Sequence, residues 1–308
     1  MKDYIKKESF YAISRYVFEV TKCGVSRRNI ADQCGFSKMT VGKVFSRLAE
    51  KGLITQIRAP HSKGRHAQLV IPSDRIRYLI INASDRNWIS YLTDFKGSMI
   101  PQRSSLLDPS MSYKDNFQMM VCDAISSFAV SDSIMFIALI RDFTPEEDIS
   151  GIALPRSCSH LLNVERTELV KRHISRYYRR YNSLYVYISG KECLIMVFEK
   201  SRILASVTFE TDVFRTEECK NEFLHRIEEI LSAHSISPDT LIFESGAVAS
   251  VFANDLYNKL KTSFTEKGYS LSRAKIYEDM GFSNEEALLN LRKQTTHTVT
   301  DMFYGENK

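Results

Sequence analysis

The chain has 308 residues, of which 44% are hydrophobic and 26% charged, a balance typical of a folded protein with one or two domains. No apolar run is long enough to cross a bilayer, and the segment MKDYIKKESF lacks the apolar stretch of a secretion signal. The six cysteines form no CxxC pair. These features predict free thiols, no metal site, no membrane partner and a cytoplasmic location.

The net charge of +5 is unevenly distributed along the chain. Residues 1–77 contain 16 lysines and arginines against 6 acidic residues, whereas the remainder contains 26 against 31. A basic first quarter on an acidic remainder is typical of a module for a polyanion attached to a domain with another role. Nucleic acid is the leading polyanion, and an anionic membrane surface is the alternative.

The first predicted element is a helix over residues 3–22. Ile13, Val17 and Val20 recur at helical spacing within it and predict that they share one buried face.

Two short helices joined by a glycine turn are predicted next. Ser26 is placed to cap the first helix, Gly35 supplies the turn, and Ser37 is placed to cap the second helix. The second helix carries an apolar stripe at helical spacing, which predicts its buried face. The stripe consists of Val41, Val44, Phe45 and Leu48. Because the opposite face is polar and cationic from the first turn onward, the pair predicts a helix-turn-helix.

Gly42 lies inside the second of these helices, where a glycine costs about 1 kcal/mol relative to alanine. It is interpreted either as a tolerated defect or as a point where the helix backbone approaches DNA closely. The helix is expected under both interpretations.

A β-hairpin with a cationic tip is predicted after the helix-turn-helix. Its strands are expected over residues 53–60 and 67–72, joined by the turn HSKGRH at residues 61–66. The glycine allows a tight turn, from which Lys63 or Arg65 can reach a phosphate or the narrow minor groove. A hairpin in this place predicts a winged helix that binds double-stranded DNA.

Different parts of this winged helix are expected to make different contacts with DNA. The start of the second helix of the pair, with Lys38 and Lys43, is expected to face base edges in the major groove. The hairpin tip is expected to contact the sugar-phosphate backbone. The full set of predicted DNA contacts is Ser26, Arg27, Arg28, Ser37, Lys38, Met39, Thr40, Lys43, Lys63, Gly64 and Arg65.

From residue 77 onward short strands alternate with helices, which predicts an α/β domain with a mixed sheet, split into two lobes. The strands are expected within residues 77–100 and over 134–140, 183–189, 192–210 (a hairpin turning at Lys200 and Ser201), 239–245 and 273–278. The helices are expected over 112–129, 164–178, 216–234, 250–268 and 284–304.

Three segments of the N-terminal half resemble the ROK family of bacterial repressors and sugar kinases. They are SKMTVGKVFSRLAEKGLI, the hairpin tip SKGR and RYLIINASDRNWISYLTDFKG; weaker echoes are YNSLYVYIS, GKECLIMVFEKSRIL and SPDTLIFESGAVAS. The resemblance covers essentially the whole chain. It implies a winged helix-turn-helix over residues 1–75 and a truncated, two-lobed, actin-like (ROK sugar-kinase-like) domain over 76–308 that forms a homodimer.

The sequence departs from the motifs of the family's kinases. The hairpin that cradles a nucleotide phosphate in the family reads INASDRN here, without glycine, and Ala83 stands at its aspartate position. Thr167 replaces the catalytic aspartate, and a threonine cannot take a sugar hydroxyl's proton near neutral pH. The second phosphate loop keeps only Gly190, and the family's zinc-binding cysteines are absent. These departures imply no catalytic residue, no enzyme activity, no cofactor and no metal.

Glu165, Arg166 and Glu210 are the candidate effector-binding residues, because the resemblance places them near the family's sugar site. The Arg166 guanidinium would suit an anionic ligand such as a sugar phosphate or a sugar acid. The alternative is that the two glutamates are solvated or paired with other residues.

These features predict a transcription regulator, expected to be a repressor in carbohydrate metabolism, which binds a DNA operator as a homodimer and has a sugar derivative as its candidate small-molecule effector. One alternative is a sugar kinase or other phosphotransferase with a rearranged active site and an appended winged helix. Another is an interaction or membrane-surface adaptor that uses the winged helix as a scaffold. The concentrated positive charge disfavours the adaptor, and the missing glycine loops and general base disfavour the enzyme.

Overall fold

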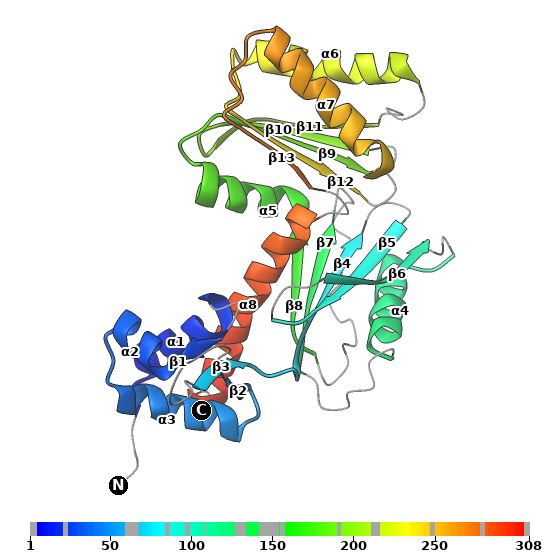
Figure 1. The fold of residues 1–308 in the computed structure, drawn as a ribbon. Helices are drawn as coiled ribbons and strands as arrows, with labels where there is room; N and C mark the ends of the chain where they lie inside the picture. Colours follow the sequence, from blue (N-terminus) through cyan, green and yellow to red (C-terminus); the bar gives the residue numbers. More distant parts are fainter. Residues whose placement is uncertain are drawn as a thin grey trace. The chain divides into compact units, whose positions relative to one another are not determined.

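A computed structural model gives the fold of the chain (Figure 1). It describes residues 5–20, 24–58, 68–83, 87–95, 99–106, 108, 110–126, 134–141, 154, 158–189, 192–210, 216–246, 250–277 and 281–304. The chain forms two compact units, one of residues 1–164 with 287–308 and the other of residues 165–286. The domain boundary expected after residue 75 stays a prediction.

The N-terminal part of the first unit combines helices with a small antiparallel sheet. Residues 59–67 lie outside the described residues, and with them the predicted contacts Lys63, Gly64 and Arg65. The sheet has the order β1-β3-β2, and the pairing of β2 with β3 confirms the two strands of the expected hairpin. The elements are α1 (Lys7–Arg15), the π-helical turn η1 (Tyr16–Val20), β1 (Val25–Ser26), α2 (Arg27–Cys34), α3 (Lys38–Glu50), β2 (Ile54–Arg58) and β3 (Gln68–Pro72).

The apolar stripe of α3 is buried as expected. Val41, Val44, Phe45 and Leu48 are each no more than 2% exposed. The expected face of the first helix is only partly right, because Val20 is 54% exposed while Ile13 and Val17 are buried. The reason is the π-helical turn at η1, whose wider spacing rotates Val20 away from the face that a regular α-helix would give it.

A five-stranded sheet forms the rest of the first unit, with the order β6-β5-β4-β7-β8. The pairs β4–β5 and β5–β6 are antiparallel, whereas β4 and β7 are parallel. The helix α4 packs Phe117 and Val121 against Trp88 and the β4 and β7 side chains. The elements are β4 (Ile76–Ala83), β5 (Asn87–Thr93), β6 (Met99–Leu106), α4 (Tyr113–Ser126), β7 (Ile134–Arg141) and β8 (Cys158–Glu165).

The second unit contains another five-stranded sheet, with the order β11-β10-β9-β12-β13. Its first three strands are antiparallel, and β9, β12 and β13 are parallel to one another. The helices α6 and α7 cover one face and α5 lies on the other (Figure 1). The elements are α5 (Arg166–His173), the π-helical turn η2 (Ile174–Tyr178), β9 (Ser183–Ser189), β10 (Glu192–Glu199), β11 (Arg202–Glu210), α6 (Glu217–Ala233), β12 (Thr240–Ser245), α7 (Ser250–Glu266) and β13 (Arg273–Tyr277).

Both sheets repeat one strand order, in which the third strand is followed by the second, first, fourth and fifth. The expected α/β class with two sheet-containing lobes is therefore confirmed. Two strands were not expected: β6 was not separated from β5, and β8 occupies residues where no strand was predicted. The hairpin of β10 and β11 turns at Lys200 as expected, with a φ of 58°.

The last helix, α8 (Gly281–Tyr304), begins in the second unit and ends in the first. Within the first unit its end packs against α1, where the Phe10 ring lies 4.7 Å from the Phe303 ring and 5.4 Å from the Tyr304 ring. The Tyr304 hydroxyl donates a hydrogen bond to the Ile5 carbonyl at 2.7 Å, and Lys7 pairs with Asp301 at 3.1 Å. None of the described helices is both long enough and apolar enough to cross a membrane.

Candidate functional site

The α2–α3 pair is fixed at both helix starts by serine caps. The Ser26 hydroxyl accepts a hydrogen bond from the Asn29 amide at 3.1 Å, and the Ser37 hydroxyl accepts one from the Thr40 amide at 3.1 Å. Between the helices Gly35 adopts a φ of 69°, the left-handed conformation that glycine enters without a Cβ clash. Both predicted caps and the predicted turn are confirmed.

The start of α3 presents its side chains to solvent. Lys38 and Met39 are exposed, Met39 to 70%, whereas Thr40 and Lys43 are half-buried. Residues 24–58 contain seven lysines and arginines against two acidic residues, so this region keeps the positive charge noted in the sequence. The contacts of these residues with DNA stay a prediction.

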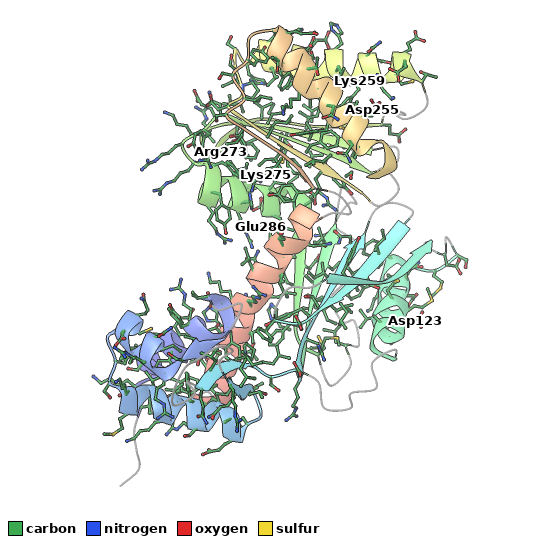
Figure 2. The ribbon with its side chains drawn as sticks, in the orientation of Figure 1. Asp123, Asp255, Lys259, Arg273, Lys275 and Glu286 are labelled. Carbon is green, nitrogen blue, oxygen red and sulfur yellow. The ribbon has the colours of Figure 1, made fainter. Side chains whose placement is uncertain are left out.

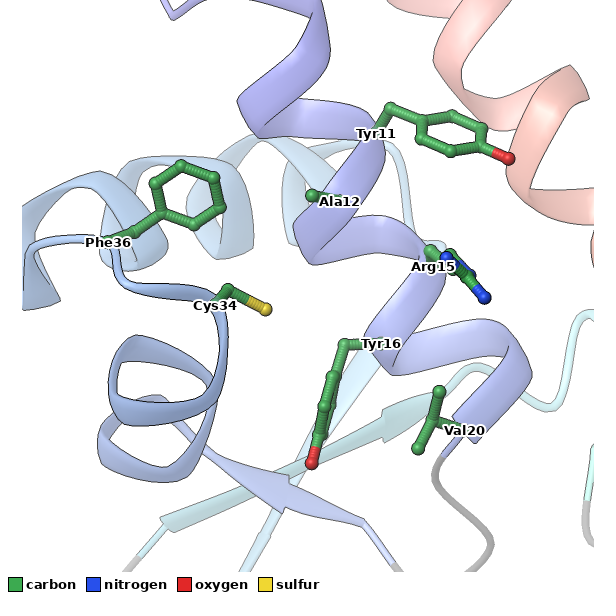
Figure 3. A pocket seen from close by; sticks show the side chains of 7 residues that line it. All are labelled: Tyr11, Ala12, Arg15, Tyr16, Val20, Cys34 and Phe36. Atoms are coloured by element: carbon green, nitrogen blue, oxygen red, sulfur yellow. The ribbon is translucent and has the colours of Figure 1, made fainter.

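A small cavity of about 260 Å³ lies between the first helix and the α2–α3 turn (Figure 3). Burial raises the pKa of the Cys34 thiol, which therefore stays protonated near neutral pH. The Arg15 guanidinium pairs with Glu19 at 3.3 Å. The cavity is lined by Tyr11, Ala12, Arg15, Tyr16, Val20, Cys34 and Phe36.

Arg166, the candidate effector contact, is fully buried in the second unit at the start of α5. Its guanidinium pairs with the Glu244 carboxylate of β12 at 3.4 Å and donates a hydrogen bond to the Ser283 hydroxyl. The guanidinium carbon lies 3.9 Å from the centroid of the Tyr187 ring. The positive charge is thus balanced by a buried carboxylate and an aromatic face.

Glu244 accepts hydrogen bonds from three groups around it besides Arg166. The Ser283 amide donates at 2.8 Å and its hydroxyl at 2.9 Å, and the Tyr185 hydroxyl is the third donor. Burial, followed by the Glu244 charge, raises the pKa of Tyr185 well above its usual value, so the phenol remains a donor. An anionic ligand that reached Arg166 would have to displace this carboxylate.

The structure does not place either candidate glutamate in this network. Glu165 is exposed at the end of β8, where its carboxylate accepts a hydrogen bond from the Thr167 hydroxyl at 3.3 Å. Glu210 is exposed at the end of β11. The partner of Arg166 is Glu244, which the sequence analysis missed, although a lone carboxylate inside the apolar strand DTLIFES was a visible sign of a buried pair.

A second buried pair joins the same two elements of this unit. The His173 Nδ1 atom lies 2.7 Å from a Glu286 oxygen, and Arg176 reaches the other oxygen at 3.4 Å. Glu286 lies near the start of α8 (Figure 2). Ser283 and Glu286 therefore fix the first turns of α8 to α5 and η2.

Comparison with known proteins bears on the fold. No protein-family model matches the chain, and no curated protein does. A solved ROK family transcriptional regulator, a homolog of the E. coli MLC protein, is 12% identical, with 96% of this chain and 100% of that chain covered and a TM-score of 0.55. The likeness is one of fold.

Two further solved structures match with lower scores. A Bacteroides thetaiotaomicron protein with an actin-like ATPase fold and unknown function is 11% identical, with coverages of 70% and 95% and a TM-score of 0.42. The inorganic polyphosphate/ATP-glucomannokinase of Arthrobacter sp. strain KM is 8% identical, with coverages of 71% and 99% and a TM-score of 0.42. Because one fold carries many functions, function has to be argued from the site.

Proposed function

We propose that the chain is a DNA-binding transcription regulator of the ROK type, with an N-terminal winged helix and an actin-like domain that lacks kinase activity. The observation that carries the proposal is the exposed, cationic start of α3. Ser37 fixes this start, and Lys38 and Met39 project from it into solvent. A helix presented in this way fits the major groove and reads base edges with its first turns.

The hairpin of β2 and β3 supports the same assignment. It pairs in antiparallel register from Ile54 opposite Pro72 to Arg58 opposite Gln68. The connection between these strands carries Lys63 and Arg65. In the proposal this connection is the wing, and its cations contact the DNA backbone beside the groove that α3 occupies.

The remaining lobes are proposed to hold two copies together so that two α3 helices reach successive half-sites. A two-fold dimer places its recognition helices about one DNA turn, or 34–36 Å, apart. The regulator is expected to act as a repressor, and its location is expected to be the cytoplasm.

The buried pair of Arg166 and Glu244 supports the absence of kinase activity in this proposal. A kinase needs a general base near the sugar hydroxyl, but Thr167 directs its hydroxyl to Glu165, at 3.3 Å. Ala83, at the position of the family's phosphate-site aspartate, is 3% exposed at the end of β4. No described contact favours the rearranged kinase over the regulator.

Lys38→Ala and Lys43→Ala are each expected to weaken binding to the preferred site by about 1–3 kcal/mol and to relax the preference at particular base pairs. The loss arises because a base edge loses its hydrogen-bond donor. The measurement is sequencing of fragments selected by each variant from a randomised duplex pool. Lys51→Ala, at the far end of α3, is the matched control and should keep the wild-type preference. An unchanged preference in both variants would show that α3 does not read the groove in this orientation.

The function itself is tested by mixing the full chain with fragmented genomic DNA and sequencing what is retained at physiological salt. The proposal expects a small set of fragments that share a short motif with two-fold symmetry. Retention of no fragments, or of fragments without a shared motif, would speak against a sequence-specific regulator.

A further inference from the structure

Gly42 of α3 leaves room for an arginine of the neighbouring helix. A Cβ atom on this residue would lie 3.2 Å from the Cζ and Nη1 atoms of Arg27, and 3.4 Å from its Nε atom. Ordinary contacts of a Cβ atom are longer than most of these distances. The Arg27 guanidinium therefore rests directly on the backbone of α3, in a place that any other residue at position 42 would narrow.

Arg27 differs from its neighbour Arg28 in its partners. Arg28 pairs with Asp32 at 3.6 Å. Arg27 is exposed, and it makes no hydrogen bond or ion pair with any residue in the described part of the chain. Its donors are thus open to a ligand, while the contact with Gly42 restricts the orientation of its planar group.

The contact also places Arg27 on the exposed face of α3. Met39 and Ser46 lie one turn before and one turn after Gly42 on the same helix face, and both are exposed. The Ser46 hydroxyl donates to the Gly42 carbonyl at 3.2 Å, so this turn has no large side chain between the guanidinium and the helix. The face that α3 presents to DNA in the proposed function thereby gains a cation from α2.

We propose that Arg27, seated on Gly42, contacts a phosphate of duplex DNA, and that position 42 is glycine because of this seat. The inference rests on the proposed DNA-binding function. A guanidinium binds phosphate through two parallel hydrogen bonds, and a group that is already oriented loses less entropy on binding. Phosphate is the expected partner because Arg27 belongs to α2, and the first helix of such a pair crosses the DNA backbone.

The seat predicts that stability and affinity change in opposite directions. Gly42→Ala and Gly42→Leu remove a glycine from a helix interior, so the melting temperature should stay the same or rise. Both should weaken DNA binding, Leu more than Ala, because the larger side chain displaces the guanidinium further. A fall in affinity with a fall in melting temperature would point to damaged folding and would overturn the inference.

A double-mutant cycle tests the coupling between the two residues. Arg27→Ala should weaken binding about tenfold, evenly across DNA sequences, and should make the log–log salt dependence shallower by about 1 for each site lost. In the Arg27→Ala background Gly42→Leu should cause no further loss. Arg202→Ala, which removes an exposed arginine from the second unit, is the charge-matched control and should leave both quantities unchanged.

The outcomes separate the inference from the function on which it rests. If Gly42→Leu weakens binding equally with and without Arg27, the helix backbone itself approaches DNA and the seat is wrong. If Arg27→Ala instead relaxes the preference at one base pair, the ligand group is a base edge and the phosphate assignment is wrong. Absence of DNA binding by the wild-type chain would overturn the proposed function and the inference with it.

Discussion

Glu244→Leu is expected to lower the free energy of unfolding by about 3–5 kcal/mol, the cost of leaving one partner of a buried ion pair without the other. The substitution leaves the Arg166 guanidinium buried beside Tyr187 without a counter-charge. It also removes the acceptor of the Ser283 amide, a backbone donor that is buried in the native state. Denaturant unfolding followed by circular dichroism measures the change.

The matched experiment is the cycle with Arg166→Met. Arg166→Met alone should also destabilise, but the double variant should lose less than the sum of the two by more than about 1 kcal/mol, since neither charge is then left unpaired. An exposed ion pair contributes about 0–1 kcal/mol, and a loss of that size in Glu244→Leu would contradict the buried pair.

Phe10→Ala is expected to cost about 3–5 kcal/mol, as truncation of a buried aromatic side chain does. The Phe10 ring is fully buried against the rings of Phe303 and Tyr304, so its removal leaves a cavity between α1 and the end of α8. Thermal and denaturant unfolding of the full chain give the loss.

Tyr304→Phe is the control for this contact, because it keeps the ring and removes only the hydrogen bond to the Ile5 carbonyl. It should cost about 1 kcal/mol. A Phe10→Ala variant as stable as the control would show that α1 does not pack on α8. The same packing means that deleting the N-terminal helices would uncover the end of α8, so point substitutions are the better probes of DNA binding.

The parts of the fold that depend on local signals could be predicted from the sequence. Ser26, Gly35 and Ser37 act within their own turn, and the burial of Val41 and Phe45 follows from helical spacing. In each case the interacting groups lie within a few residues of one another.

Other parts have no such local signal. The strand β6 contains a proline and polar residues in MIPQRSSL, which hides the alternation of a strand. The π-helical turn that exposes Val20 has no recognisable pattern in YVFEV. Each of these segments is shaped by the elements packed around it, and tertiary packing overrides weak local preference.

The candidate site depends on contacts between distant residues. Arg166 and Glu244 are 78 residues apart, and nothing in either local segment shows that they meet. Gly42 could be read from the sequence as a glycine in a helix, but its reason depends on the crossing of α2 and α3, which brings Arg27 onto it.

The measurement that tests the central claim most directly is the salt dependence of DNA binding by the full chain, followed by fluorescence anisotropy on a fragment that the protein selects. A dimer with two winged helices should neutralise on the order of six to ten phosphates, so a plot of log affinity against log salt should have a slope of roughly −5 to −9. A slope near zero would contradict the account, because a protein that binds DNA through α2, α3 and a cationic wing must release counterions.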